Sequence, residues 1–332
     1  QPFSVTGGDP ARELGVANVI AEVPGTDRDA APVLVLAHLD HLGTGWPDVR
    51  EGNAGQVHPG ADDNASGVAV ALELARVLAA EPPRARAVRF VFTTAEEAGL
   101  AGARHALGKM GERRPFACVN LDTVGRLGDG PLQVIGADSA REWPFVFMGI
   151  GYTTGIQTAI VTEPLVSSDH AACHEAGVPA VQLFSGPNAD YHRPTDTADK
   201  LDAAGMAKVA DVAYETVTFL AERTDPLTVQ LGGPPAPASP GAGKARTASL
   251  GTMPDFTFAG PGVRVEQVTP GSAAERAGLV AGDVIVALAG TEVADLRAYS
   301  DALKAHQPGA EVEVRVVCAG QPLTVRATLG AR

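Results

Sequence analysis

Two adjacent carboxylates, Glu96 and Glu97, follow an apolar run that is typical of a buried strand. Acidic side chains placed together at such a point repel each other and lose hydration, which raises their free energy. Residues 90 to 99 contain no lysine or arginine that could offset the charge. A metal ion could do so, with one glutamate as its ligand and the other as a proton carrier. The alternative is a solvated helix start, where acidic residues are favoured by the helix dipole.

Histidine and aspartate occupy similar positions elsewhere in the chain. His38 and Asp40 follow the apolar run 32–37, and residues two apart on a strand share a face. The histidine could bind a metal while the aspartate orients it, or it could make only a local hydrogen bond. Asp63 lies in a turn before a helical pattern, where a carboxylate could bridge two cations or cap the helix.

Two further candidates follow later apolar runs. Asp122 comes directly after the run 116–121, and His192 lies in a loop after the run 178–184. A loop histidine is by default exposed to solvent, so each position has an ordinary explanation when it is taken alone. In a layered α/β fold, however, the carboxyl ends of the strands meet at one edge of the sheet. The positions after successive strands therefore predict a single metal centre.

Short apolar runs alternate with helical patterns over most of the chain. One helix is predicted with Val68, Leu72, Ala75 and Leu78 on its buried face, and it ends before two prolines. A second helix is predicted over about residues 199–223. This alternation predicts a layered α/β sheet with helices on both faces. The runs that predict buried strands are residues 32–37, 87–93, 116–121, 132–135 and 178–184.

Composition narrows the classes of partner. The chain has 332 residues and a formal net charge of -13, which argues against a nucleic-acid partner. No segment approaches the about 20 apolar residues of a membrane span. The chain opens on Gln1 rather than methionine, so we expect a processed or trimmed chain whose natural N-terminus is not visible.

The cysteines and the remaining histidines carry weaker signals. The three cysteines are odd in number, widely separated and without a Cys-x-x-Cys pair, so neither a disulfide framework nor a zinc knuckle is expected. Cys173 has no evident paired base and is expected to be a packing residue in a helix. His41, His58 and His105 are expected on the surface.

Six motifs follow one another along the chain. They are AHLDHLG at 37–43, PGADDNASG at 59–67, AEEAGL at 95–100, NLD at 120–122, SDH at 168–170 and YHRPTDT at 191–197. In this combination they resemble the motif series of the dizinc aminopeptidases, a group that includes aminopeptidase Y, aminopeptidase S and the bacterial leucyl aminopeptidases. The resemblance covers roughly residues 15 to 222. It implies a zinc-exopeptidase fold, with three α/β/α layers and a mixed, mostly parallel sheet.

The resemblance also implies a ligand set for two zinc ions. Asp63 would bridge the ions, His38 and Asp122 would hold one of them, and Glu97 and His192 would hold the other. Relatives in this group carry a cis peptide bond after the bridging aspartate, which falls here between residues 63 and 64.

The same motifs imply catalytic roles. Glu96 would be the general base that activates a zinc-bridging water and returns the proton to the leaving amine. Asp40 would support a histidine ligand, and Tyr191 would assist the oxyanion, as a tyrosine does in some relatives. The motif match places Asp169 and His170 near the substrate-binding pocket, although a helix cap explains the aspartate equally well.

The function implied is removal of N-terminal residues from peptides with free N-termini. Two alternatives stay open. The first is a related zinc enzyme, such as a glutaminyl cyclase or a carboxypeptidase-like hydrolase. Cyclases of this fold usually cover the site with tryptophan, and this chain has only Trp46 and Trp143. The second is a catalytically inactive peptidase fold that serves as a peptide-binding adaptor, although every expected catalytic position is filled.

The chain is predicted to have two domains. Residues 1–224 would form the catalytic domain, residues 225–249 a linker rich in proline, glycine and alanine, and residues 250–332 a small β-rich domain. The segments GPGVRVEQV at 260–268, GSAAERAGL at 271–279 and AGDVIV at 281–286 resemble a bacterial-type PDZ domain.

Domains of this type bind a C-terminal peptide by adding a strand to a sheet edge. The resemblance implies a groove in which the loop ending at Gly262 presents backbone N–H groups to the terminal carboxylate of the peptide. Val263 and Val265 would line this groove. The alternative is a domain that shields its own edge. Fusion of a peptidase to such a domain suggests a periplasmic or secreted protein.

Overall fold

The computed structural model describes residues 1–7, 12–46, 50, 52–111, 114–161, 168–231, 247–255, 258 and 260–331. Nearly all of the described residues up to Leu231 form one compact unit, and the residues from 247 onward belong to a second. The predicted domain limits at residues 224 and 250 stay predictions, and most of the predicted linker lies outside the described residues.

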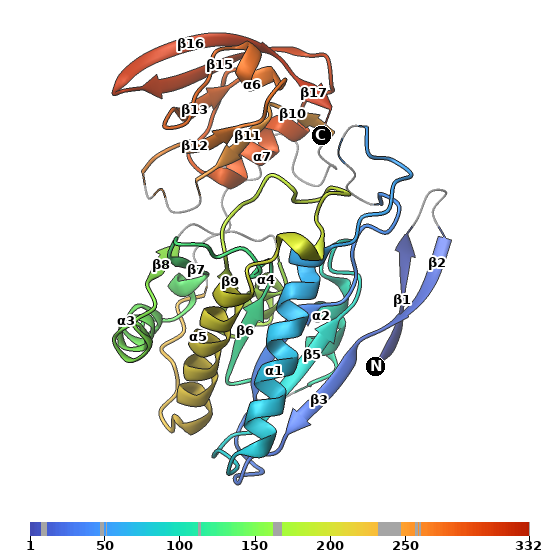
Figure 1. Cartoon of the computed structure of the whole chain (residues 1–332), viewed down its shortest axis with the longest axis vertical. Coiled ribbons are helices and arrows are strands. Elements are labelled where there is room, and N and C mark those ends of the chain that lie inside the picture. The colour runs from blue at the N-terminus through green and yellow to red at the C-terminus, as the bar shows by residue number, and fades with distance from the viewer. Residues whose placement is uncertain are drawn as a thin grey trace. The chain divides into compact units, whose positions relative to one another are not determined.

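A seven-stranded sheet forms the centre of the first unit (Figure 1). Its order is β3-β5-β4-β6-β9-β7-β8, and the four strands β5, β4, β6 and β9 run parallel. β3 pairs antiparallel with β5, and β7 pairs antiparallel with β9. The bounds are Val19–Val23 for β3, Val33–His38 for β4, Val88–Thr93 for β5, Ala117–Leu121 for β6, Leu132–Ile135 for β7, Thr158–Val161 for β8 and Ala180–Phe184 for β9.

Helices cover both faces of this sheet. On one face α1, α3 and α5 share a core with the side chains of Val33, Val35 and Ala37. On the other face α2 and α4 pack against Leu34 and Leu36, the alternate side chains of the same strand. The predicted three-layer α/β/α fold with a mixed, mostly parallel sheet is therefore confirmed. The helix bounds are Gly67–Ala80 for α1, Ala101–Gly108 for α2, Trp143–Thr154 for α3, His170–Glu175 for α4 and Ala203–Glu222 for α5.

Five predicted strands and two predicted helices correspond to β4, β5, β6, β7, β9, α1 and α5. The buried face predicted for α1 was wrong at one position, because Leu72 is 55% exposed. Val70, Ala71, Leu74 and Leu78 are buried instead, so the buried stripe lies to one side of the predicted one. No described helix combines the length and the apolar character that crossing a membrane would require.

Several elements of the first unit were not predicted. β1 (Pro2–Gly7) and β2 (Arg12–Ala17) pair antiparallel in a separate two-stranded sheet. Short helical turns comprise Ala137–Ser139, called η2, and Ala198–Lys200, called η3. The turn Ala61–Ser66, called η1, precedes α1 and contains non-helical backbone at Asp63 and Asn64.

Cys118 of β6 and Cys173 of α4 form a disulfide. This pairing could not be predicted from spacing, since the two residues are 55 positions apart. Both lie in the core between the sheet and α4, where packing of the helix on β6 brings them together. Cys173 is thus a packing residue, as predicted, but it also forms a disulfide, which the spacing of the cysteines did not lead us to expect. Cys318 is free.

The second unit is built on a sheet of order β11-β12-β13-β15-β16, with β14 paired to β13. A second, two-stranded sheet joins β10 to β17. Leu250, Ile285 and Leu303 belong to the buried core of the second unit. The bounds are Ala248–Ser249 for β10, Thr252–Pro254 for β11, Val263–Val268 for β12, Ala273–Arg276 for α6, Val284–Leu288 for β13, Thr291–Glu292 for β14, Leu296–Lys304 for α7, Glu311–Cys318 for β15, Gln321–Thr328 for β16 and Gly330–Ala331 for β17.

The peptide groove predicted along β12 was wrong. β12 pairs with β11 on one side and with β13 on the other, so it has no free edge to which a peptide could add. Val263 and Val265 are core residues at 2% and 1% exposure. The N–H of Gly262 donates to the carbonyl of Ala294 and is not available to a carboxylate. On this side of the sheet the terminal strand is β11.

The sheet core predicts a large difference between two phenylalanines of the first unit. Phe90 of β5 is fully buried, whereas Phe145 of α3 is 64% exposed. We expect Phe90→Ala to lower the free energy of unfolding by about 3–5 kcal/mol, because it leaves a cavity, and Phe145→Ala to change it by less than about 1 kcal/mol. Both tryptophans, Trp46 and Trp143, belong to this unit, so tryptophan fluorescence during urea unfolding measures its stability. Equal effects of the two variants would contradict the assigned core.

Candidate metal centre

The parallel strands deliver polar side chains to one edge of the sheet. His38 is the last residue of β4 and is in register with Thr93, the last residue of β5. Glu96 and Glu97 follow β5, and Asp122 follows β6 directly. These residues come together because parallel neighbours end at the same edge. The predicted gathering of these segments is observed.

The first group of possible ligands surrounds His38. Its Nε2 lies 3.1 Å from Oδ1 of Asp63 and 3.4 Å from Oδ1 of Asp122. Its Nδ1 lies 3.0 Å from the backbone oxygen of Asp40. A carbonyl oxygen can only accept, so Nδ1 carries the hydrogen and the lone pair of Nε2 points at two carboxylates when the ring is neutral. That arrangement requires either a second proton on the ring or a cation.

The second group lies on the other side of the same aspartate. Nε2 of His192 is 3.2 Å from Oδ2 of Asp63 and 3.2 Å from Oε2 of Glu97. His41 joins this group, with Nδ1 2.9 Å from Oε1 of Glu97 and 3.9 Å from Oδ2 of Asp63. The two oxygens of Asp63 therefore face two different groups, each with a histidine and a second carboxylate. This is the geometry of a carboxylate that can bridge two cations.

His41 was predicted to be a surface histidine, and this prediction was wrong. Its side chain is only 9% exposed, and its ring lies edge-on to that of His192 at 5.7 Å. His41, Asp63 and Glu97 each offer an atom within a common 4.8 Å, as do His38, Asp63 and Asp122. The available signal was the spacing His-x-Asp-His, but His41 lies beyond the end of β4, so the period of the strand could not place it.

His58 is also buried, at 4% exposure, and its predicted surface position was wrong. Its Nδ1 faces the backbone oxygen of Gln56 at 2.9 Å. Its ring is 6.5 Å from that of His41, so it lies behind the second group.

The charges of the site support a cation. Burial lowers the pKa of His38, but the neighbouring carboxylates of Asp122 and Glu96 outweigh it and raise the pKa well above 6.5. Burial raises the pKa of Asp63, but hydrogen bonds from His192 and His38 outweigh burial and lower the pKa far below its ordinary value. Without a metal ion, the imidazole of His38 would therefore hold a proton among these carboxylates.

The donor atoms fit a divalent metal. No ion pair among the described residues joins a lysine or arginine to Asp63, Glu96, Glu97 or Asp122. Imidazole nitrogen combined with carboxylate oxygen is a donor set that zinc accepts readily. Both groups of side chains, with Asp63 shared between them, could each hold one such ion.

Glu96 lies beside these groups but in neither of them. It is 8% exposed, and burial raises the pKa of its carboxyl well above 4.5, with Asp122, Asp169 and Glu97 adding to the rise. Asp40 holds it in place, since its carboxylate accepts the backbone N–H of Glu96 at 3.1 Å and that of Glu97 at 3.3 Å. A buried carboxyl of raised pKa near a metal centre is suited to proton transfer.

The predicted support of His38 by Asp40 takes a different form from the one expected. The backbone oxygen of Asp40 is 3.0 Å from Nδ1 of His38, whereas the nearest oxygen of its carboxylate is 3.8 Å away. Asp40 therefore fixes His38 through its main chain and the Glu96–Glu97 segment through its side chain.

Tyr191 stacks on the ring of His192, with ring centroids 3.9 Å apart. It is 38% exposed, so part of the ring reaches solvent at the site. Burial of its hydroxyl, reinforced by the carboxylates of Asp63 and Glu97, raises the pKa of Tyr191 well above 10. The phenol stays protonated and can donate a hydrogen bond.

Asp169 and His170 do not line a substrate pocket, and the substrate-binding role predicted for them was wrong. Both are fully buried at 0% exposure. The carboxylate of Asp169 accepts a hydrogen bond from the hydroxyl of Thr93, at the end of β5. Burial raises the pKa of Asp169 to about 6. Both residues are therefore interior, and the carboxylate of Asp169 lies close enough to Glu96 and His38 to affect their charges.

Unusual backbone conformations are found next to the site residues. Ala95, Thr123 and His192 have φ values of 62°, 55° and 57°, which residues with a Cβ rarely adopt. They precede Glu96, follow Asp122 and carry a site imidazole, respectively. Strained backbone of this kind persists where surrounding contacts over-determine it and is typical of functional sites. The predicted cis peptide bond between residues 63 and 64 is present.

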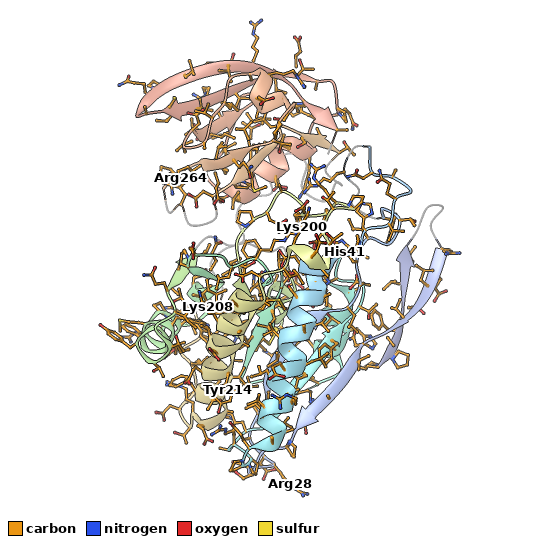
Figure 2. All side chains as sticks on the ribbon, in the orientation of Figure 1. Arg28, His41, Lys200, Lys208, Tyr214 and Arg264 are labelled. Atoms are coloured by element: carbon orange, nitrogen blue, oxygen red, sulfur yellow. A yellow bond between two sulfur atoms is a disulfide. The ribbon has the colours of Figure 1, made fainter. Side chains whose placement is uncertain are left out.

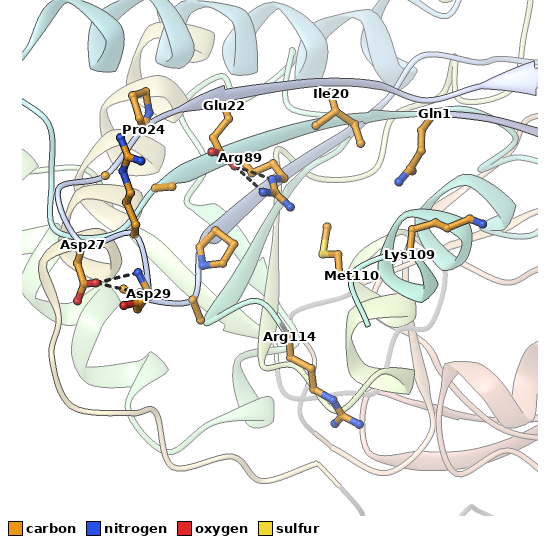
Figure 3. A pocket seen from close by; sticks show the side chains of 16 residues that line it. Gln1, Ile20, Glu22, Pro24, Asp27, Asp29, Arg89, Lys109, Met110 and Arg114 are labelled. Atoms are coloured by element: carbon orange, nitrogen blue, oxygen red, sulfur yellow. Dashed lines mark hydrogen bonds and ion pairs between the residues drawn. The ribbon is translucent and has the colours of Figure 1, made fainter. Parts of the chain in front are cut away.

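A cavity of about 770 Å³ lies elsewhere in the first unit (Figure 3). It is lined by Pro32 and Ala87, which directly precede β4 and β5, and so lies at the amino ends of these strands. Arg28 also lines it, and Figure 2 places Arg28 and His41 at opposite ends of the unit. Its wall includes the ion pair between Arg89 and Glu22. The metal centre and this cavity are therefore separate.

Comparison with known proteins agrees with the site. The family model described as peptidase family M28 matches residues 18–217, and that of the PDZ domain matches residues 264–317. Aminopeptidase YwaD of Bacillus subtilis is 30% identical over 172 residues, which are 48% of this chain and 37% of that protein. The chain spans 37 to 57% of the lengths of the curated relatives that it matches first.

Two solved structures illustrate the range of similar folds. An aminopeptidase from Aneurinibacillus sp. strain AM-1 has a TM-score of 0.52 at 28% identity, over 66% of this chain and 51% of that one. A glutaminyl cyclase from an Acidobacteriales bacterium has a TM-score of 0.52 at 21% identity, over 68% of this chain and 79% of that one. The second likeness concerns the fold alone.

The first family match covers more than half of the chain and includes all of the segments that form the metal centre. The second covers β13, β14 and all but one residue each of β12 and β15. The chain belongs to peptidase family M28, and a PDZ domain follows its peptidase unit.

Proposed function

We propose that this chain is a dizinc aminopeptidase that removes N-terminal residues from peptides. The observation that carries the proposal is the position of Asp63, whose two oxygens face two separate pairs of a histidine and a carboxylate. Membership of a peptidase family and similarity to proteins named as aminopeptidases support the reaction class.

In this proposal His38 and Asp122 hold one zinc ion, Glu97 and His192 hold the other, and Asp63 bridges them. Bound zinc would supply a Lewis acid that polarises the peptide carbonyl and makes water more acidic. The three carboxylate ligands offset most of the charge of two dications, so the site stays near neutrality.

Glu96 is proposed as the general base. It takes the proton of the attacking water and passes it to the leaving amine. Asp40 holds the backbone of Glu96 through a hydrogen bond. The carboxylate of Glu96 is thereby oriented toward its role in proton transfer, although Glu96 is not one of the proposed zinc ligands. Tyr191 would donate its phenolic hydrogen to the oxyanion of the tetrahedral intermediate.

The substrates proposed are peptides with free N-termini, because acidic side chains beside a metal attract an α-ammonium group. We also propose that the protein is periplasmic or secreted. The disulfide between Cys118 and Cys173 supports this location, since disulfides persist mainly in oxidising compartments.

Two alternative functions remain to be separated from this one. A glutaminyl cyclase would use one zinc ion and produce pyroglutamate. The second group of side chains, around His192 and Glu97, favours two ions over one. Trp143 is fully buried in the core, so Trp46 is the only tryptophan of the sequence that could cover the site as in a cyclase. An inactive peptidase that acts as a peptide-binding adaptor would not need the complete set of side chains found here.

Peptide binding by the PDZ domain is a further part of the proposal. The sheet order moves the expected site from β12 to the outer edge of β11, the strand that ends the sheet on that side. Strand addition there would use backbone hydrogen bonds of Thr252–Pro254.

The general-base role predicts the effect of Glu96→Gln. The amide keeps the shape of the side chain but cannot accept the proton of water, so we expect kcat/KM on aminoacyl-coumarin substrates to fall about 10²–10⁴-fold with zinc content unchanged. Glu73→Gln, which changes an exposed residue of α1, serves as the control and should retain activity. Unchanged activity in Glu96→Gln would contradict the mechanism, whereas a wild type without activity would favour the adaptor.

The bridging role predicts different metal losses in different variants. Asp63→Ala should lose both zinc ions, whereas His38→Ala and His192→Ala should each lose one. His41→Ala should retain two, because the proposed ligand set does not include His41, although it contacts the ligand Glu97. Metal content after dialysis is measured by mass spectrometry. A wild-type protein with one ion and pyroglutamate as its product would instead identify a cyclase.

The charge of the metal-free site predicts proton release on zinc binding. Although burial lowers it, the pKa of His38 is raised well above 6.5 by Asp122 and Glu96, so the ring holds a proton at neutral pH that zinc must displace. Apparent zinc affinity should therefore fall as the pH decreases. Calorimetry in buffers of different ionisation enthalpy measures the proton release. Heats that do not depend on the buffer would contradict this prediction.

A further inference from the structure

Three carboxylates surround a single guanidinium beside the metal centre. Arg126 donates to Oδ2 of Asp190 at 2.6 Å and to Oδ1 of Asp196 at 2.7 Å, and its Nε lies 3.6 Å from Oδ2 of Asp62. Asp62 and Asp196 have side chains that are only 1% exposed, and Arg126 is 16% exposed. Among the described residues, no other lysine or arginine pairs with either of these two aspartates.

The four residues come from the three segments that carry proposed ligands. Arg126 lies four positions after Asp122, and Asp62 directly precedes Asp63. Asp190 and Asp196 lie two positions before and four positions after His192. The guanidinium therefore connects the exit of β6, the turn before α1 and the loop after β9, and none of its partners is itself a proposed ligand.

Asp196 transmits this connection to the bridging aspartate. Oδ1 of Asp196 accepts a hydrogen bond from Arg126. Oδ2 of Asp196 accepts the backbone N–H of Asp62 at 2.9 Å and that of Asp63 at 3.1 Å. The side chain of Asn188, which lies in the loop after β9 that carries His192, donates a hydrogen bond to the carboxylate of Asp62 at 2.9 Å. This bond is a second link between that loop and the turn before α1. The main chain of Asp63 is thus held by a carboxylate whose orientation depends on Arg126.

We propose that Arg126 is a positioning residue that sets the separation of the two ligand groups by fixing Asp63 relative to Asp122 and His192. Without it, three aspartates with little exposure would repel one another and the loop would lose its contact with the turn. A planar guanidinium presents several donors in fixed directions, which a lysine cannot reproduce. Lys200 does not substitute for it, because it reaches only Asp190, at 2.7 Å. The inference rests on the proposed zinc site.

The test compares Arg126→Gln and Arg126→Lys with wild type. The control Arg76→Gln also removes an arginine from an ion pair with a carboxylate, but on the exposed surface of α1. Zinc affinity of the metal-free protein is measured by competition with a chromophoric chelator. We expect Arg126→Gln to bind zinc about 10–100-fold more weakly, Arg126→Lys to be intermediate, and Arg76→Gln to match wild type.

Two further readouts separate positioning from stability. The melting temperature of each metal-free protein shows whether it is folded, and the visible absorption of the protein saturated with Co²⁺ reports ligand geometry. We expect the Co²⁺ spectrum to change in both Arg126 variants. If Arg126→Gln does not fold, Arg126→Lys decides. Wild-type zinc affinity together with a wild-type Co²⁺ spectrum in a folded Arg126 variant would overturn the inference.

The outcomes for the wild type distinguish this inference from the proposed function. A wild type that binds zinc but releases no N-terminal residues would refute the aminopeptidase and leave the effect of Arg126 measurable. A wild type that binds neither zinc nor Co²⁺ would refute both.

Discussion

The structure depends on one electrostatic constraint. Four carboxylates, from Asp63, Glu96, Glu97 and Asp122, are crowded at the edge of the sheet with no lysine or arginine paired to them among the described residues. Such a group is stable only if a positive charge lies among it. In the metal-free protein, a proton held by the imidazole of His38, whose pKa is raised by Asp122 and Glu96, supplies part of that charge, and in the proposed enzyme two zinc ions supply it. The position of the Asp63 carboxylate between two groups of side chains is the reason that two ions, rather than one, are proposed.

The fold provides the rigid frame that this crowding requires. Parallel strands buried on both faces end together, so their last residues and the turns after them can hold side chains within about 0.5 Å of a useful position. Around this frame, Asp40 ties two segments through its backbone oxygen and its carboxylate. Arg126 ties three others through Asp190, Asp196 and Asp62. Neither Asp40 nor Arg126 is a proposed metal ligand, and both bind to the segments that carry the ligands.

Much of the peptidase unit could be predicted from the sequence. Strands that are buried on both faces appear as apolar runs, and the polar residue after each run marks the end of a strand, so His38, Asp122 and the Glu96–Glu97 pair could be located. The motif resemblance then identified Asp63 and His192, which lie in a turn and a loop without a period of their own. Local pattern and motif order were sufficient to locate these residues, because the carboxyl ends of parallel strands always meet at one edge of the sheet.

The predictions that failed needed information about distant contacts. The groove at Val263 was excluded by the pairing of β11 with β12, which only the sheet order reveals. His41 reaches the site through the path of a turn, and Cys173 meets Cys118 because α4 packs on β6. Asp169 belongs to a motif that does lie near the site, but the motif could not tell whether its carboxylate faces the substrate or the core.

The central claim is that divalent ions lie on both sides of Asp63. Anomalous diffraction from crystals of the zinc-loaded protein, collected above and below the zinc absorption edge, tests it most directly. The account predicts two anomalous peaks, one between His38 and Asp122 and one between Glu97 and His192, with a carboxylate oxygen of Asp63 bound to each. A single peak, or peaks that leave Asp63 without a metal, would contradict it.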